Sequence, residues 1–113
     1  MTARELDRTV RSSVSATAAP CDPGGWDESA PCRRFYFIAP ATGRLSIDNA
    51  WNGVPPLDAT IVIPANRYVA TSTDNGFNRV SLSASLIAGV RYEVRVNSYY
   101  GAQVFDMTAT FVR

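Results

Sequence analysis

Residues 80–96, VSLSASLIAGVRYEVRV, alternate apolar and polar side chains on both sides of one glycine. Valine, leucine and alanine share one parity before Gly89, and valine and tyrosine share one parity after it. A period of two residues is typical of β-strands that bury one side. The link at residues 87–89 ends in Gly89, so the segment predicts two strands joined by a short hairpin with one residue at positive φ.

The same alternation continues through most of the chain. Segments rich in Pro, Gly, Asn and Asp separate the apolar runs, which is typical of turns. About seven strands at spacings near ten residues predict a single all-β, antiparallel domain, either a sandwich or a barrel. The expected strands are residues 34–39, 44–49, 59–63, 68–72, 77–86, 90–97 and 103–112.

The apolar parity of these runs also predicts the core. A register shift of one residue would turn the whole apolar side of a strand toward water, so the assignment is sharply testable. The expected core residues are Leu45, Ile47, Ile61, Ile63, Val80, Leu82, Leu86, Tyr92, Val94, Val96, Phe105, Met107 and Phe111.

The N-terminal segment has a different composition. Residues 1–20 are polar and rich in Ser, Thr and Ala, and they lack the apolar stretch of a secretory signal. We expect them to form an N-terminal arm or linker that precedes a β-sandwich domain at residues 21–113, with strands from residue 33 onward. No stretch of the 113 residues approaches the length of a membrane span.

Two cysteines, Cys21 and Cys32, bracket a short loop rich in Pro and Gly. Zinc needs more ligands than this pair supplies, and the CxxC spacing of redox proteins is absent. We expect a disulfide, which the loop-entropy argument values at about 3 kcal/mol of stability. A disulfide indicates an oxidising compartment, so the predicted location is secreted, extracellular or at the cell surface.

Charge and composition narrow the chemistry. Eleven basic and ten acidic residues leave a net charge of +1, which gives no indication of a nucleic-acid partner or an anionic membrane. The chain has no His, and all its basic residues are Arg. The commonest general base and the Schiff-base lysine are therefore missing, and we predict that the protein is not an enzyme.

Three segments in order resemble the bacterial pre-peptidase C-terminal domain: CRRFYFIAPATGRLSI, LDATIVIPANRYVATSTDNG and VSLSASLIAGVRYEVRVNSYYGAQVFDMTATF. The resemblance covers residues 32–112. It implies a jelly-roll-like β-sandwich of about 7–8 strands, appended to secreted enzymes and not itself catalytic. Among its relatives, the collagen-binding domains of collagenases bind protein fibres or use calcium, and others are assigned to carbohydrate or general surface binding.

Calcium is the one cofactor that the residues raise. Asp58, Asp74 and Asn75 lie near strand ends and carry the oxygen ligands that calcium prefers. The same residues also suit a hairpin turn and the start of a strand. In place of the acidic ligands of the calcium-binding relatives, the N-terminal segment has its cysteine pair, so we expect no cofactor.

Aromatic and basic residues predict a ligand surface. A ring in or beside a turn, as at Trp51, either covers the end of the sandwich or is exposed to a ligand. If the strands at residues 77–86 and 90–97 pair, their arginines share one polar face, which is either solvated or an anchor for a ligand. The candidate binding residues are Trp51, Arg79, Arg91, Arg95, Tyr99 and Tyr100.

Together these features predict a non-catalytic extracellular module that binds a polysaccharide or a fibrous protein. The alternative is a structural subunit of an extracellular assembly, which would use residues 1–20 for self-assembly by adding to a neighbour's sheet. Whether these residues contact their own sandwich or another chain separates the two hypotheses.

Overall fold

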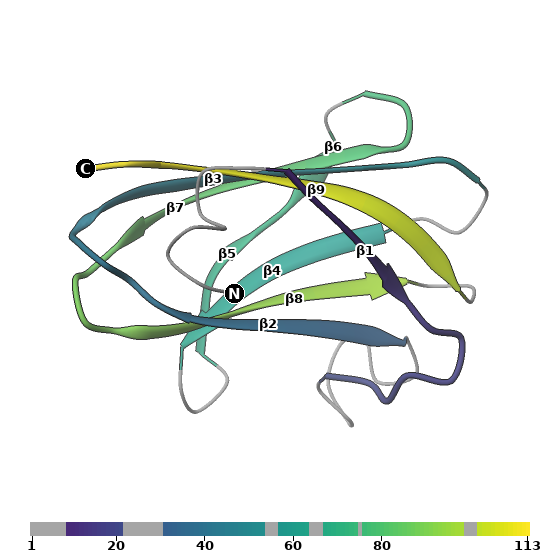
Figure 1. The fold of residues 1–113 in the computed structure, drawn as a ribbon, viewed down its shortest axis with the longest axis horizontal. Helices are drawn as coiled ribbons and strands as arrows, with labels where there is room; N and C mark the ends of the chain where they lie inside the picture. Colours follow the sequence, from purple (N-terminus) through teal and green to yellow (C-terminus); the bar gives the residue numbers. More distant parts are fainter. Residues whose placement is uncertain (1–8, 22–30, 54–56, 64–66, 75, 99–101) are drawn as a thin grey trace.

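The computed structural model describes residues 9–21, 31–53, 57–63, 67–74, 76–98 and 102–113. Their regular structure is nine β-strands in two antiparallel sheets, which confirms the all-β sandwich. None of these residues belongs to a helix that could cross a membrane. Figure 1 shows the sheets as two layers, with β3, β7 and β9 in one and β2, β4 and β8 in the other.

The five-stranded sheet has the order β1-β9-β3-β7-β6, and the four-stranded sheet has the order β2-β8-β4-β5. In chain order the strands are β1 (Thr9–Val14), β2 (Cys32–Ile38), β3 (Gly43–Trp51), β4 (Leu57–Ile63), β5 (Arg67–Thr71), β6 (Thr73–Asp74), β7 (Arg79–Leu86), β8 (Arg91–Ser98) and β9 (Gln103–Val112). Among these, only β4–β5 and β6–β7 are consecutive strands that pair in one sheet. All other connections cross between the layers, which makes the sandwich jelly-roll-like.

The predicted hairpin between residues 77–86 and 90–97 is wrong. β7 pairs with β3 and β6, whereas β8 pairs with β2 and β4. The turn itself has the expected form, because Gly89 has a φ of 81° and the Val90 amide donates to the Ile87 carbonyl at 3.2 Å. Two further backbone bonds hold this turn to the β2–β3 connection: the Gly89 amide donates to the Ala39 carbonyl, and the Ala39 amide donates to the Val90 carbonyl. At this turn the chain passes from β7 in the five-stranded sheet to β8 in the four-stranded sheet.

The inward sides of the two sheets form one apolar core, as predicted. Of the thirteen predicted core residues, eleven are buried, and Ile63 and Phe111 are partly buried against the same core. Phe35 of β2 meets Phe105 of β9 edge to face, with 6.4 Å between ring centroids, so aromatic packing joins the two layers.

The first strand lies in the predicted arm. β1 pairs with β9 along the edge of the five-stranded sheet, with Thr9 opposite Thr108 and Val14 opposite Gln103. Val14 is fully buried in the core. The sandwich thus includes Thr9–Val14, ahead of residue 21, where the sequence predicts its start.

The β6–β7 turn is held firmly to the end of β3. Gly76 and Asn78 both have positive φ, at 102° and 52°. The Asn78 carbonyl accepts a hydrogen bond from the Trp51 amide at 3.1 Å, and the Asn78 side chain donates to the Gly53 carbonyl at 3.2 Å. Phe77, predicted to begin a strand, lies in this turn and is 94% exposed.

The predicted disulfide between Cys21 and Cys32 is present, with the two Cα atoms 5.5 Å apart. Arg34 holds the loop end to the four-stranded sheet, because its Nη2 donates to the Cys21 carbonyl at 2.7 Å and its Nε to the Cys21 sulfur at 3.3 Å. The disulfide therefore fixes Cys21 beside Cys32, the first residue of β2.

The core assignment predicts different costs for two substitutions. Val94 on β8 has no exposed surface. Because Val94→Ala leaves a cavity, it should lower the free energy of unfolding by about 1–3 kcal/mol. The exposed Ser83 points outward from β7, so Ser83→Ala should change stability by less than about 0.5 kcal/mol. Urea denaturation, followed by circular dichroism, measures the free energy of unfolding of both variants. Comparable losses of stability at the two sites would show that the buried side of the strands is wrongly assigned.

Removal of the disulfide should weaken the fold measurably. The two cysteines are 11 residues apart in the sequence, and opening a loop of this size costs about 3 kcal/mol in the chain-entropy model. The double variant Cys21→Ser, Cys32→Ser should therefore unfold at lower urea concentration than the parent protein. As a control, the parent protein is denatured without a reducing agent and treated with a thiol label, and its intact mass is measured. Neither cysteine should be labelled, and labelling of both would contradict the presence of the disulfide.

Candidate functional site

The three arginines predicted to share one polar face lie on different sheets. Arg79 is on the outer side of the five-stranded sheet, whereas Arg91 and Arg95 belong to β8 of the four-stranded sheet. The separation follows from the path of the chain, because β7 and β8 are not neighbours. The predicted common face therefore does not form.

Arg95 is also buried, with 3% of its surface exposed. Its Nε donates to Glu93 Oε1 at 3.0 Å, and its register partners on the neighbouring strands are Arg34 and Thr60. A buried charge is tolerated when an opposite charge accompanies it. Arg95 therefore positions Glu93 instead of presenting its guanidinium group to solvent.

Of the three aromatic residues predicted beside turns, the structure describes only Trp51. Trp51 ends β3 and is partly buried against the core, and its buried indole N–H has no hydrogen-bond partner among the residues that the structure describes. The ring therefore packs against the core, and Trp51 also lines an open pocket. Tyr99 and Tyr100 lie outside the described residues.

The described part of the calcium set is divided between the two sheets. The Asp58 carboxylate accepts hydrogen bonds from the Ala59 amide and the Ser72 hydroxyl, which fixes the start of β4. Asp74 is in the other sheet, and Asn75 lies outside the described residues. Within the described ranges, no group of three or more acidic or cysteine side chains could hold a metal ion.

An aromatic surface that the sequence reasoning missed lies on the outer side of the four-stranded sheet. Tyr36 of β2 is opposite Glu93 of β8, and Tyr68 of β5 is opposite Val62 of β4. Glu93 and Val62 are themselves register partners, so the four residues form one row across the sheet. At about 4.8 Å per strand, the two tyrosines stand roughly 14 Å apart. Tyr36 is 40% exposed and Tyr68 51%, whereas Val62 between them is buried. We define the tyrosine face as Arg34, Tyr36, Tyr68, Arg91 and Glu93.

Charged groups fix the β2 half of the tyrosine face. Glu93 Oε1 lies 3.2 Å from Arg34 Nε and 3.0 Å from Arg95 Nε, so one carboxylate bridges two guanidinium groups. The Arg91 guanidinium lies 4.7 Å from the Tyr36 ring centroid, a cation–π contact. The hydrogen bond from Arg34 to Tyr36 and, less strongly, the charge of Glu93 raise the pKa of Arg34, against a lowering by burial. Tyr36 is thus held in place from two directions.

The signal for Tyr36 is present in the sequence. In CRRFYFI two phenylalanines, Phe35 and Phe37, flank Tyr36, and if both face the core, strict alternation sends Tyr36 outward. An aromatic ring on the polar side of a strand is a candidate for ligand binding. Tyr68 has no comparable signal, because a bulge in the β4–β5 pairing between Ile61 and Val62 sets its side.

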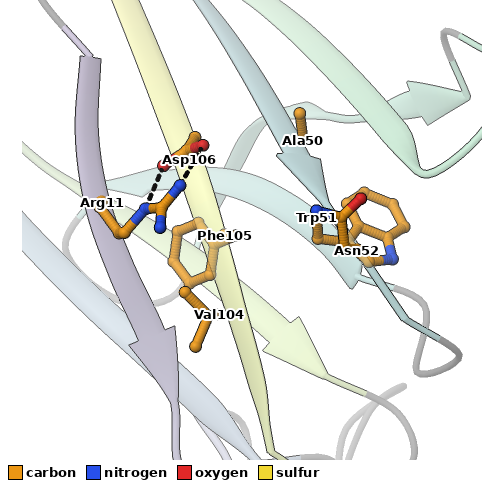
Figure 2. Close-up of a pocket in the computed structure, with 7 residues that line it drawn as sticks. All are labelled: Arg11, Ala50, Trp51, Asn52, Val104, Phe105 and Asp106. Carbon is orange, nitrogen blue, oxygen red and sulfur yellow. Dashed lines mark hydrogen bonds and ion pairs between the residues drawn. The ribbon is translucent and has the colours of Figure 1, made fainter.

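A pocket of about 330 Å³ opens on the outer side of the five-stranded sheet. The Arg11–Asp106 ion pair lies on one side of it, and Trp51 and Asn52 lie on the other (Figure 2). Arg11 Nε donates to Asp106 Oδ1 at 2.9 Å and Nη2 to Oδ2 at 3.2 Å, so the pair is bidentate. Ala50, Val104 and Phe105 complete the lining.

Comparison with solved structures identifies similar folds. The pre-peptidase C-terminal domain of a collagenase from Bacillus anthracis has a TM-score of 0.70 at 13% identity, over 96% of this chain and 90% of that chain. A surface-associated copper-binding protein of Methylomicrobium album BG8 has a TM-score of 0.62 at 6% identity, over 93% of each chain. A family 35 carbohydrate binding module from an environmental isolate has a TM-score of 0.51 at 15% identity, over 88% of this chain and 84% of that chain.

The resemblance to pre-peptidase C-terminal domains is thereby confirmed as a likeness of fold. The sequence itself matches no protein-family model and no curated protein.

The Arg11–Asp106 pair predicts a pH-dependent contribution to stability. The hydrogen bond that the Asp106 carboxylate accepts from Arg11 lowers the pKa of Asp106 below the usual 3.8. A carboxyl whose pKa is lowered by folding stabilises the folded state above its unfolded pKa, and this stabilisation is lost as the pH falls toward the folded pKa. The melting temperature of Asp106→Asn should therefore be below that of the parent protein near neutral pH, and the difference should shrink as the pH falls below 3.8 and disappear once Asp106 is protonated in the folded protein. Thermal unfolding across this range measures it. A difference that persists in acid would mean that the ion pair is not its cause.

Proposed function

We propose that this protein is a non-catalytic extracellular binding module that attaches a secreted or surface protein to a polysaccharide. The observation that carries the proposal is the tyrosine face. Two half-exposed rings, Tyr36 and Tyr68, stand on the two edge strands of one sheet, with charged hydrogen-bonding groups beside Tyr36.

The chemistry of the tyrosine face suits sugars. The C–H side of a sugar ring packs against the face of an aromatic ring, so two separated tyrosines can contact two units of one polymer. Sugar hydroxyls can accept hydrogen bonds from the exposed Arg34 and Arg91 and donate to Glu93. Because Arg91 and Arg34 already hold Tyr36, little side-chain freedom is lost when a ligand binds.

The remaining features support the non-catalytic and extracellular parts of the proposal. The sequence has neither His nor Lys, so common acid–base and nucleophilic mechanisms lack their usual groups. The Cys21–Cys32 disulfide suits an oxidising compartment. A carbohydrate binding module is among the proteins that share the fold.

The structural-subunit alternative is weaker than the sequence suggested. Thr9–Val14 lie within the segment expected to reach a neighbour, yet they pair with β9 of their own sheet. These residues are therefore docked on their own sandwich, and only the outer edge of β1 is left to pair with another sheet. A fibrous protein is the competing ligand class, and insoluble collagen represents it in the retention assay described next.

Retention on insoluble polymers tests the proposal. The parent protein should be retained on one or more of cellulose, chitin and peptidoglycan, and Tyr36→Ala and Tyr68→Ala should each reduce retention strongly. Both side chains are half-exposed, so the melting temperature should change little. Phe77→Ala is the matched control, because Phe77 is an exposed ring remote from this face in the β6–β7 turn. The variant Tyr99→Ala, Tyr100→Ala tests the site predicted from the sequence in the same assay.

Three outcomes would contradict the proposal. Retention on collagen alone would assign a fibrous-protein ligand. Loss of retention in Phe77→Ala with the tyrosine variants unaffected would move the site to the β6–β7 turn. No retention on any polymer, with assembly that depends on residues 1–20, would favour the structural subunit.

A further inference from the structure

The pocket in Figure 2 exists because one small residue lies among large ones. Ala50 of β3 is paired in register with Asp106 on one side and Arg79 on the other, and Asp106 is paired with Arg11. In this row of outward side chains, Ala50 alone ends at its Cβ atom. The sheet is therefore hollowed above Ala50.

The walls of the hollow carry donors, acceptors and apolar surface. Arg11 and Asp106 bind each other through one edge of the guanidinium group, with 75% of the Arg11 side chain and 41% of the Asp106 side chain still exposed. Asn52, which is also exposed, adds an amide that both donates and accepts. Val104 supplies an exposed apolar side chain.

We propose that this pocket is a second binding site, which takes one neutral sugar unit. Arg11 and Asp106 cancel each other's charge, so the lining favours neither an anion nor a cation. A sugar ring offers adjacent hydroxyls, which donate to Asp106 and accept from Arg11 and Asn52, and an apolar C–H side that contacts Val104. The volume of about 330 Å³ is at the small end of ligand pockets and suits a single ring.

This site is separate from the tyrosine face. It lies on the outer side of the five-stranded sheet, whereas the tyrosine face lies on the outer side of the four-stranded sheet. The inference goes beyond the proposed function and does not depend on it. A polymer can be held at the tyrosine face while a free sugar or a chain end occupies the pocket.

The N-terminal strand is part of the site. Arg11 belongs to β1, whereas the other lining residues belong to β3, β9 and the residue after β3. A ligand that contacts Arg11 and Asn52 together binds only while β1 is docked, so it stabilises the docked strand. Ligand binding should therefore slow amide hydrogen exchange throughout β1.

Nuclear magnetic resonance titration of the ¹⁵N-labelled full chain tests the proposal. The probes are the methyl glycosides of glucose, galactose, mannose and N-acetylglucosamine, with glucuronate and glucosamine as charged comparisons. At least one neutral glycoside should give saturable shifts at the amides of Ala50, Val104 and Asp106, with affinity in the millimolar range. The two charged sugars should bind more weakly.

Ala50→Leu fills the hollow and should abolish these shifts. Ser46→Leu is the matched control, because Ser46 is on the same strand and the same outer side but does not line the pocket, and its binding should equal that of the parent. Asn52→Ala provides an independent variant at an exposed position, where the loss of one hydrogen bond should weaken binding about fivefold. Dispersed spectra and unchanged melting temperatures verify that each variant is folded.

Two results would overturn the inference. One is the absence of saturable shifts at the pocket for every neutral glycoside. The other is binding that survives Ala50→Leu and Asn52→Ala, or that is lost equally in Ser46→Leu. Shifts confined to Tyr36, Glu93 and Tyr68 are a case of the first result: they refute the pocket but support the tyrosine face, so the two proposals fail separately.

Discussion

The burial of one side of each strand against the opposite sheet is the constraint on which this structure depends. Leu45 and Ile47 of the five-stranded sheet and Ile61 and Val94 of the four-stranded sheet are almost fully excluded from solvent. Because side chains alternate along a strand, fixing the inner side also fixes the outer side. Both candidate surfaces are therefore by-products of core packing.

The strands and their buried sides were predictable because alternation is a local property. Every predicted core residue is buried or partly buried against the core, and the predicted strands 34–39, 44–49 and 103–112 overlap β2, β3 and β9. Thr9–Val14 escaped detection because TVRSSV is mostly polar. An edge strand over a finished core needs few large apolar residues, and Val14 supplies the main one.

Strand neighbours were not predictable in the same way. Alternation states which side of a strand faces the core, but it does not state which strand lies beside it. A hairpin and a crossover at Ile87–Gly89 bury the same residues, and the strand pairings distinguish them, because β7 pairs with β3 whereas β8 pairs with β2 and β4. The predicted grouping of Arg79 with Arg91 failed for this reason. The grouping of Tyr36 with Tyr68 depends on three strand pairings and a bulge, none of which leaves a pattern in the sequence.

The use of arginine as the sole basic side chain shapes both surfaces. A guanidinium group has several donors in a fixed plane, so one side chain can join groups from different segments. Arg34 contacts the Cys21 carbonyl and sulfur as well as Glu93, and thereby ties the disulfide to the sheet. Arg11 binds Asp106 through two donors and fixes an edge strand. Lysine, with a single ammonium group, would not reproduce either planar arrangement.

The order of the strands also bears on aggregation. A sandwich of two open sheets has four edges, and each edge strand offers unpaired backbone groups to other molecules. Here β6 is only two residues long, β5 is interrupted by the bulge, β2 carries Arg33 and Arg34, and β1 carries Arg11 at its centre. Short length, irregular pairing and charge all discourage the addition of a further strand. The open edges of the sandwich are thus poor templates for a continuous sheet between molecules.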